Sequence, residues 1–294
     1  MLTADRVVLA LGNPPPRLPR SVHVDGSRLL PDPWSPDLVD RVGEADRVLL
    51  VGTGLTAVDV AVQISCARPS VRLTAMSRHG LLPLRHLADP PGPAPAFGAD
   101  AHSLRAVLGE VRRCLAAGAD WRCLVESLKL VANDVWASLP YDDRDQFVRH
   151  VKRHWEVARH RMAPVMADSI DELRNNGRLT VAIPSAVDVA SYDVVVNCTG
   201  PAPVATPGWS PLVDNLAVKG MLWPGPFGLG IDVDADGALL DADGVAARGV
   251  YAVGAARRGV EWEVAAVPDI RRQAVRLARH LDAAAAEPLV SLVG

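Results

Sequence analysis

The chain has 294 residues, 49% of them hydrophobic, and a formal net charge of −3. This length is enough for one large or two ordinary domains with hydrophobic cores. The composition excludes a disordered protein, and the small negative charge argues against a polybasic surface for nucleic acid. No stretch reaches the roughly 18 apolar residues that a membrane span needs.

The N-terminus and the cysteines bear on the cellular compartment. Residues 1–16, MLTADRVVLALGNPPP, lack the basic start and small-residue cleavage site of a secretory signal. The cysteines lie far apart, with no Cys-x-x-Cys pair, at Cys66, Cys114, Cys123 and Cys198. We therefore predict reduced thiols in a cytoplasmic protein.

Strands and helices alternate at both ends of the chain. Apolar runs predict strands at residues 7–11, 47–51, 71–76, 178–183, 192–197 and 249–253, and helices at 55–66 and 263–285. The proline-rich residues 13–40 are predicted to cross between regions, and residues 88–100 to form a loop. Such alternation predicts an α/β protein with parallel sheets.

Between residues 103 and 175 the hydrophobic period changes. Apolar residues recur every three or four positions in four consecutive segments, which is typical of amphipathic helices. We therefore expect an all-helical block of roughly seventy residues, inserted into the α/β protein.

The segment VGTGLTAVDVAV, starting at Val51, contains a glycine turn between a strand and a helix. It fits G-x-G-x-x-(G/A), in which the first glycine permits the tight turn and the second lets the backbone approach a pyrophosphate. The phosphates then meet the N-terminus of the helix. The predicted nucleotide-binding residues are Gly52, Thr53, Gly54, Leu55, Thr56 and Ala57.

The residues that follow the predicted strand at 71–76 indicate which nucleotide binds. An NAD site places an acidic residue there for the ribose 2′-OH, whereas this chain has Ser77 and Arg78. Because arginine suits a 2′-phosphate, we predict NADPH rather than NADH. The alternative is a glycine-containing turn without a ligand.

Three further segments resemble parts of flavoproteins with two dinucleotide-binding domains. The first, starting at Arg6, is RVVLALGNPPP, which resembles the strand that ends a flavin-binding segment. The second, starting at Tyr192, is YDVVVNCTGPAP, which resembles the strand that closes the NADPH domain. The third, starting at Gly249, is GVYAVGAARRGVEWEV, which resembles the late FAD segment. Together with the glycine turn, SRHGLLPLRH and WEVARHRMAPVMADSIDEL, they identify the chain as similar to the bacterial FAD/NAD(P)-binding family of the YdhS type. That family is related in architecture to flavin-dependent N-hydroxylases.

The resemblance implies an α/β fold in which a Rossmann-like NAD(P)-binding domain with an all-helical insertion joins the C-terminal part of an FAD-binding domain. The implied division is 1–45 (remnant FAD-domain strand and crossover), 46–100 (Rossmann-like segment), 101–176 (helical insertion), 177–203 (return strands) and 204–294 (C-terminal FAD-domain segment). It further implies cofactor contacts for Gly12, Gly200, Gly254, Trp262 and Glu263. For Trp262, burial in the core is the alternative.

The resemblance also predicts that the FAD site is incomplete. Family members begin with an FAD-binding βαβ unit that carries its own G-x-G-x-x-G, whereas here Met1 directly precedes the strand at 7–11. Gly254 is followed by Ala255 where many flavoproteins have Gly-Asp. Two explanations stay open: a truncated gene product, or a protein that works without tightly held FAD.

Three other patterns have simpler explanations. DVDADGALLDAD from Asp232 begins like a calcium loop, but it lacks the final Glu and flanking helices, so we predict a hairpin turn. His150 and His154 lack the H-E-x-x-H pattern of a zinc protease and predict a cationic surface rather than a metal site. The basic run Arg159 to Met162 predicts either a phosphate or acidic-substrate contact or a solvated helix start.

These observations leave two hypotheses for function. The first is an oxidoreductase related to monooxygenases, with hydride passing from NADPH to flavin and with an unknown small-molecule substrate. No catalytic acid or base is identified. The second is a non-catalytic nucleotide-binding protein, or a fragment that pairs its exposed sheet edge with a second copy or a partner chain.

Overall fold

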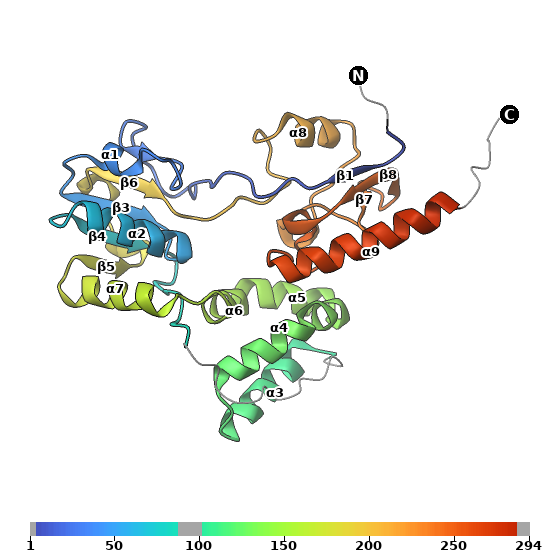
Figure 1. Cartoon of the computed structure of the whole chain (residues 1–294), viewed down its shortest axis with the longest axis horizontal. Helices are drawn as coiled ribbons and strands as arrows, with labels where there is room; N and C mark the ends of the chain where they lie inside the picture. Colours follow the sequence, from blue (N-terminus) through green and yellow to red (C-terminus); the bar gives the residue numbers. More distant parts are fainter. Residues whose placement is uncertain (1–3, 88–101, 287–294) are drawn as a thin grey trace.

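The computed structural model describes residues 4–87 and 102–286. It contains two α/β regions, at the left and right of Figure 1, and a block of helices below and between them. The loop predicted at residues 88–100 lies outside the described residues. No helix in the described ranges is both long and apolar enough to cross a membrane.

The first α/β region is built on a five-stranded parallel sheet. Its strands, in the order β2-β6-β3-β4-β5, are β2 (Leu29–Leu30), β6 (Val194–Asn197), β3 (Arg47–Val51), β4 (Arg72–Met76) and β5 (Leu179–Ala182). Every neighbouring pair is parallel. Their carboxyl ends therefore meet at one edge, where open α/β sheets bind ligands.

Helices cover one face of this sheet. α1 (Leu38–Val42), α2 (Leu55–Ala67) and α7 (Pro164–Asn175) contribute to one apolar cluster with β3, β4 and β6. The opposite face packs on the crossing segment before β2 and on residues near two short 3-10 helices, η2 (Pro184–Ala186) and η3 (Val189–Ser191). Because both faces are covered, the central strand β3 is almost wholly apolar.

The second α/β region contains a three-stranded sheet in the order β1-β8-β7. β1 (Val7–Leu9) is parallel to β8 (Ala246–Ala252), and β7 (Ala238–Leu240) is antiparallel to β8. The other elements of this region are α8 (Pro211–Val218), α9 (Val267–Ala286), η4 (Pro226–Gly228) and η5 (Gly254–Arg257). Within the described residues β1 is an edge strand, and its Val7 and Val8 are exposed.

The helical block carries its own apolar interior. It consists of α3 (Leu104–Ala116), α4 (Trp121–Ser138), α5 (Tyr141–Gln146), one π-helical turn η1 (Phe147–Val151) and α6 (Lys152–Arg159). Ser103 and Asp120 cap α3 and α4 through side-chain hydrogen bonds to backbone N–H groups. The predicted helical block is therefore present from α3 to α6. Its predicted last helix, α7, instead packs on the five-stranded sheet, because its apolar face joins the core of that sheet.

Two chain crossings connect the α/β regions. The segment after β1 and the segment after β6 run side by side across the top of Figure 1, and Pro16 and Pro201 form an antiparallel bridge between them. The predicted crossing segment thus contains β2 and α1, which were not predicted because each is very short.

One helix start differs from the prediction, and the Asp-rich segment agrees with it. The last helix begins at Val267, not Glu263, and Pro268 favours a first turn there. The Asp-rich segment is a pair of turns: Asp234 Oδ1 accepts hydrogen bonds from the Gly237 and Ala238 N–H groups, and Asp241 Oδ1 from those of Asp243 and Val245. The predicted turn is confirmed.

Candidate functional site: a basic cavity at the sheet edge

The glycine turn lies where β3 meets α2. Gly52 has a φ of 130°, and a Cβ placed on it would come within 2.2 Å of the Cys198 carbonyl oxygen. Its N–H donates a hydrogen bond to the Met76 carbonyl oxygen at 2.8 Å. Only glycine fits this close approach of neighbouring strand ends. Gly54, in contrast, has open space where its Cβ would be.

The N-terminus of α2 has no protein cap. Gly54, at the N-cap position, offers no side chain, and the first turn contains no acidic residue. α3 and α8 instead have serine caps, Ser103 and Ser210. The free N–H groups and the helix dipole at α2 therefore favour an anion.

Thr53 and Ser77 connect the glycine turn to the loop after β4. The buried Thr53 hydroxyl hydrogen-bonds the Leu81 carbonyl oxygen at 2.6 Å and the Ser77 hydroxyl at 2.8 Å. Ser77 Oγ also accepts the Gly80 N–H at 3.2 Å. These bonds hold the loop that carries Arg78 next to the N-terminus of α2.

A cavity of about 840 Å³ opens at this edge of the sheet. Of the thirteen predicted cofactor residues, those that line it are Gly52, Thr53, Gly54, Leu55, Thr56, Ser77, Arg78 and Gly200. Ala57 lies beneath it in the apolar core. The sequence spacing therefore brings the predicted nucleotide residues to one site.

Besides His160, which pairs with Glu156, three basic side chains line the cavity: Arg78, His79 and Arg153. Within the described ranges none of them has a carboxylate partner among the ion pairs. Desolvation, followed by the charges of Arg153 and Arg78, lowers the pKa of His79. The lowered pKa leaves His79 mainly neutral at pH 7, so the charges of Arg78 and Arg153 make this open cavity a site for an anion.

His79 and Arg153 were not among the predicted cofactor residues. Arg153 lies in sequence between His150 and His154, in the segment for which the sequence predicted a cationic surface, and it is distant in sequence from the glycine turn. α6 brings it to the cavity. The three-dimensional fold, rather than a local motif, supplies this contact. No group of metal-ligating residues occurs among the described residues.

Glu156 is the acidic residue among those that line the cavity, and its charge is already balanced. It contacts Arg258 at 2.6 Å and His160 at 3.2 Å. Burial raises the pKa of Glu156, but the His160 hydrogen bond and the charges of Arg258, His160 and Lys152 outweigh this effect and lower the pKa to about 2. Glu156 therefore stays ionised and links α6 to the C-terminal region.

The basic run Arg159 to Met162 divides between the cavity and the interior. His160 lines the cavity. Arg159 pairs with Glu263 at 3.2 Å, Arg161 pairs with Glu126, and Met162 is buried in the core. One of the four residues thus faces the candidate site, and the others stabilise the packing of α6 and α7.

Cys198, at the end of β6, also lines the cavity. Burial raises the pKa of its thiol to about 12. The thiol therefore stays protonated at neutral pH and is a poor nucleophile.

The residues predicted to contact flavin are dispersed. Gly12 is exposed after β1, while the buried Gly254 donates its N–H to Gln273 Oε1 at 2.7 Å. Trp262 stacks among aromatic rings, 4.8 Å from both the Trp136 and the Phe147 ring centroids. Of the four residues Gly12, Gly254, Trp262 and Glu263, Trp262 lines an apolar cavity inside the helical block, and none lines the basic cavity beside α2.

Protein groups already occupy the backbone donors in this region. Asn133 Oδ1 accepts hydrogen bonds from the Trp262 and Glu263 N–H groups at 2.8 and 2.7 Å. The buried Glu263 carboxylate pairs with Arg159 and accepts the Trp155 indole N–H at 3.1 Å. These contacts fix the segment before α9 against the helical block.

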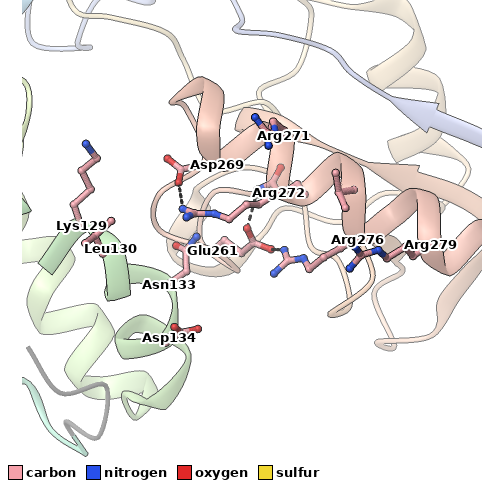
Figure 2. A pocket seen from close by; sticks show the side chains of 12 residues that line it. Lys129, Leu130, Asn133, Asp134, Glu261, Asp269, Arg271, Arg272, Arg276 and Arg279 are labelled. Carbon is pink, nitrogen blue, oxygen red and sulfur yellow. Dashed lines mark hydrogen bonds and ion pairs between the residues drawn. The ribbon is translucent and has the colours of Figure 1, made fainter. Parts of the chain in front are cut away.

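A second polar cavity, of about 430 Å³, lies between α4 and α9. Figure 2 shows arginines of α9 facing Lys129, Asn133 and Asp134 across it. Two of its carboxylates are paired, Asp269 with Arg272, and Glu261 with Arg257 at 2.7 Å and with Arg276. Arg271 and Arg279 have no partner among the ion pairs of the described residues, but the first turn of α9 contains Asp269, whereas the first turn of α2 contains no acidic residue. The helix N-terminus here is therefore less favourable for an anion than that of α2.

Solved structures of similar fold include monooxygenases and an N-hydroxylase, two of them solved with FAD. L-lysine 6-monooxygenase from Pseudomonas syringae is 16% identical, with a TM-score of 0.54, over 95% of this chain and 64% of its own. DfoA from Erwinia amylovora, a cadaverine monooxygenase solved with FAD, is 13% identical, with a TM-score of 0.53, over 95% and 60%. The ornithine N-hydroxylase KtzI from Kutzneria sp. 744, whose structure includes reduced FAD, NADP⁺ and ornithine, is 14% identical, with a TM-score of 0.50, over 93% and 62%.

These similarities establish the fold alone. They confirm the predicted class, a Rossmann-like domain combined with part of an FAD-binding domain. The chain spans 60–64% of the length of these three structures. No protein-family model and no curated protein matches the chain. The assignment to the YdhS type stays a prediction.

Proposed function

We propose that this chain binds NADPH in the basic cavity beside α2 and belongs to an FAD/NADPH-dependent oxidoreductase related to the N-hydroxylating monooxygenases. The observation that carries the proposal is the uncapped N-terminus of α2 facing the same cavity as the unpaired Arg78, His79 and Arg153. In the predicted division residues 46–100 and 177–203 form the nucleotide domain and residues 101–176 an insertion. Because β2, α1 and α7 also pack in the five-stranded sheet region, we assign these three elements to the nucleotide domain as well.

The residues fit NADPH in two places. The pyrophosphate would accept hydrogen bonds from the first-turn N–H groups of α2, next to Gly54, where the absence of a side chain leaves room. The 2′-phosphate would lie between Arg78 and Arg153, because guanidinium groups match phosphate geometry. Thr53 and Ser77 would position the Arg78 loop rather than contact the nucleotide charge.

FAD is proposed as the hydride acceptor because the fold matches proteins solved with FAD. When bound, FAD would supply redox chemistry that protein side chains lack. The backbone N–H groups of Trp262 and Glu263 are not free to bind a flavin, since both donate to Asn133. The predicted contacts of Gly12, Gly254, Trp262 and Glu263 with flavin therefore stay a proposal, and so does its substrate.

One observation favours a second candidate function. The dispersed flavin residues and the exposed edge strand β1 are compatible with a nucleotide-binding protein that turns over only with a second copy or a partner chain, or not at all. A cytoplasmic location stays a prediction.

The visible spectrum of the purified chain, with and without added FAD and NADPH, tests the proposal. Flavin absorption that co-purifies or is reconstituted, and that NADPH bleaches, would support the oxidoreductase. A colourless chain that binds NADPH and no FAD would favour the second candidate. Absence of binding to either nucleotide would refute both.

A further inference from the structure

We propose that the apolar cavity inside the helical block binds a neutral, apolar small molecule, such as a fused-ring aromatic or a short alkyl chain. This cavity, of about 250 Å³, lies between α3, α4, η1 and α6, with Trp262 contributing from the C-terminal region. Among the described residues that line it, His154 is the only one with an ionisable side chain. The inference stands independently of NADPH binding.

Tryptophan is concentrated at this cavity. The chain has 7 tryptophans, and Trp121, Trp136, Trp155 and Trp262 all line it. The Trp136 indole N–H donates to the Gly259 carbonyl oxygen at 2.9 Å, and that of Trp155 donates to Glu263. With these N–H groups bonded to other parts of the protein, the rings offer carbon surfaces to a ligand.

These walls exclude a charged ligand. The buried charge of an amino-acid substrate needs hydrogen-bonding or ionic partners, and the cavity offers only His154. Hydrophobic burial is therefore the main source of affinity available here. The ligand class differs from the lysine, ornithine and cadaverine named for the proteins of similar fold.

An irregular helix forms part of the wall. The π-helical turn η1 begins at Phe147 and ends at Val151, and both side chains line the cavity. π-helical turns are rare and occur frequently at functional sites. The cavity is therefore lined by a helix segment of a kind that is over-represented at functional sites.

The volume points to a small molecule as the occupant. An apolar cavity of about 150 Å³ binds benzene, so about 250 Å³ has room for a larger ring system or chain. A helix, about 10 Å across with its side chains, is too wide for it. Leu115, at the rim on α3, is exposed and provides an apolar entrance.

One helix separates this apolar cavity from the basic one. His154, Trp155 and Ala158 of α6 line the apolar cavity, whereas Arg153, Glu156 and Val157 line the basic cavity. The two sets alternate with the helical period, so α6 presents a different face to each cavity. A molecule in the apolar cavity would therefore occupy a site of its own.

Quenching of tryptophan fluorescence by bromobenzene tests this proposal on the wild-type chain. Bromine quenches a tryptophan that it contacts. We expect a saturable component that unbrominated toluene reverses, above the linear collisional quenching of the exposed Trp34 and Trp223. Linear quenching alone, or a saturable component that toluene leaves unchanged, would overturn the proposal.

Two substitutions then locate the site. Ala132→Phe on α4 and Val111→Phe on α3 place a larger side chain at the cavity wall, and each is expected to weaken saturable quenching at least tenfold. The matched control is Leu130→Phe, on the same helix at a position 70% exposed to solvent, which should leave the affinity within twofold. Far-UV circular dichroism identifies folded variants. Unchanged affinity in a folded Ala132→Phe or Val111→Phe variant would contradict the assignment.

Discussion

The edge of the five-stranded sheet and the segment before α9 were both predicted to contact cofactors, but they differ in whether other protein groups bind their polar groups. At the sheet edge, the N-terminus of α2 and the cations Arg78 and Arg153 face a cavity without protein partners for their charges. Before α9, Asn133 binds the backbone donors, and Arg159 pairs with Glu263. Unsatisfied polar groups, more than motif positions, distinguish a binding site from internal packing.

Substitution of Gly52 should have the largest effect. Gly52→Ala places a Cβ within 2.2 Å of the Cys198 carbonyl oxygen at a φ that favours glycine. Because backbone must move, we expect a loss of about 4 kcal/mol in the free energy of unfolding. Urea denaturation measures this loss.

Gly54→Ala is the matched control for that experiment. Its Cβ would meet no atom within 4 Å, so the stability should change by less than about 1 kcal/mol. The methyl group would nevertheless crowd a bound pyrophosphate and weaken NADPH binding. Equal destabilisation by the two substitutions would contradict the geometry described for the turn.

Glu263→Gln examines the segment before α9. The substitution removes the charge of the buried Glu263 and leaves the largely buried Arg159 without its anionic partner, and we expect a loss of about 3 kcal/mol. The control is Glu44→Gln, which breaks an exposed pair with Arg68 and should cost under about 1 kcal/mol. If Glu263→Gln were as mild as its control and abolished flavin binding instead, Glu263 would be a ligand contact rather than a packing residue.

Acid should selectively weaken the link between α6 and the C-terminal region. The pKa of Glu156 is about 2 in the folded state and near 4.5 when unfolded, so its contribution is present above pH 4.5 and is lost as the pH falls towards 2. Allowing for partial exposure of the carboxylate, we expect about 2 kcal/mol.

The comparison of wild type with Glu156→Gln measures that contribution. The difference in unfolding free energy should be largest at neutral pH and should disappear near pH 2. A difference independent of pH would mean that Glu156 stabilises the fold through packing rather than charge.

The sequence predicted local structure better than long-range contacts. Strand β3 was predicted to the residue, because a buried apolar run followed by a glycine turn leaves few alternatives. β2 and α1 were missed, since two to five residues give no measurable period. α8 was also missed, although Ser210 caps it and Pro211 begins it, a pattern that marks a helix start.

In the candidate site, too, residues of a local motif could be predicted and residues brought in by long-range packing could not. Gly52, Gly54 and Arg78 could be predicted because the glycine turn and the following strand are a local motif. Arg153 could not, because its place in the cavity depends on how the helical block packs against the sheet. Asn133 was missed for the same reason: only the fold brings α4 to the backbone of Trp262 and Glu263.

Calorimetric titration of NADP⁺ and NAD⁺, on the wild type and on Arg78→Ala, tests the central claim most directly. We expect NADP⁺ to bind the wild type at least tenfold more tightly than NAD⁺. Arg78→Ala should weaken NADP⁺ binding about 10- to 100-fold, as expected for loss of a charge-assisted contact to phosphate, and leave NAD⁺ binding within twofold. Equal affinities of the wild type for the two nucleotides, or no binding of either, would contradict the assignment of this cavity to NADPH.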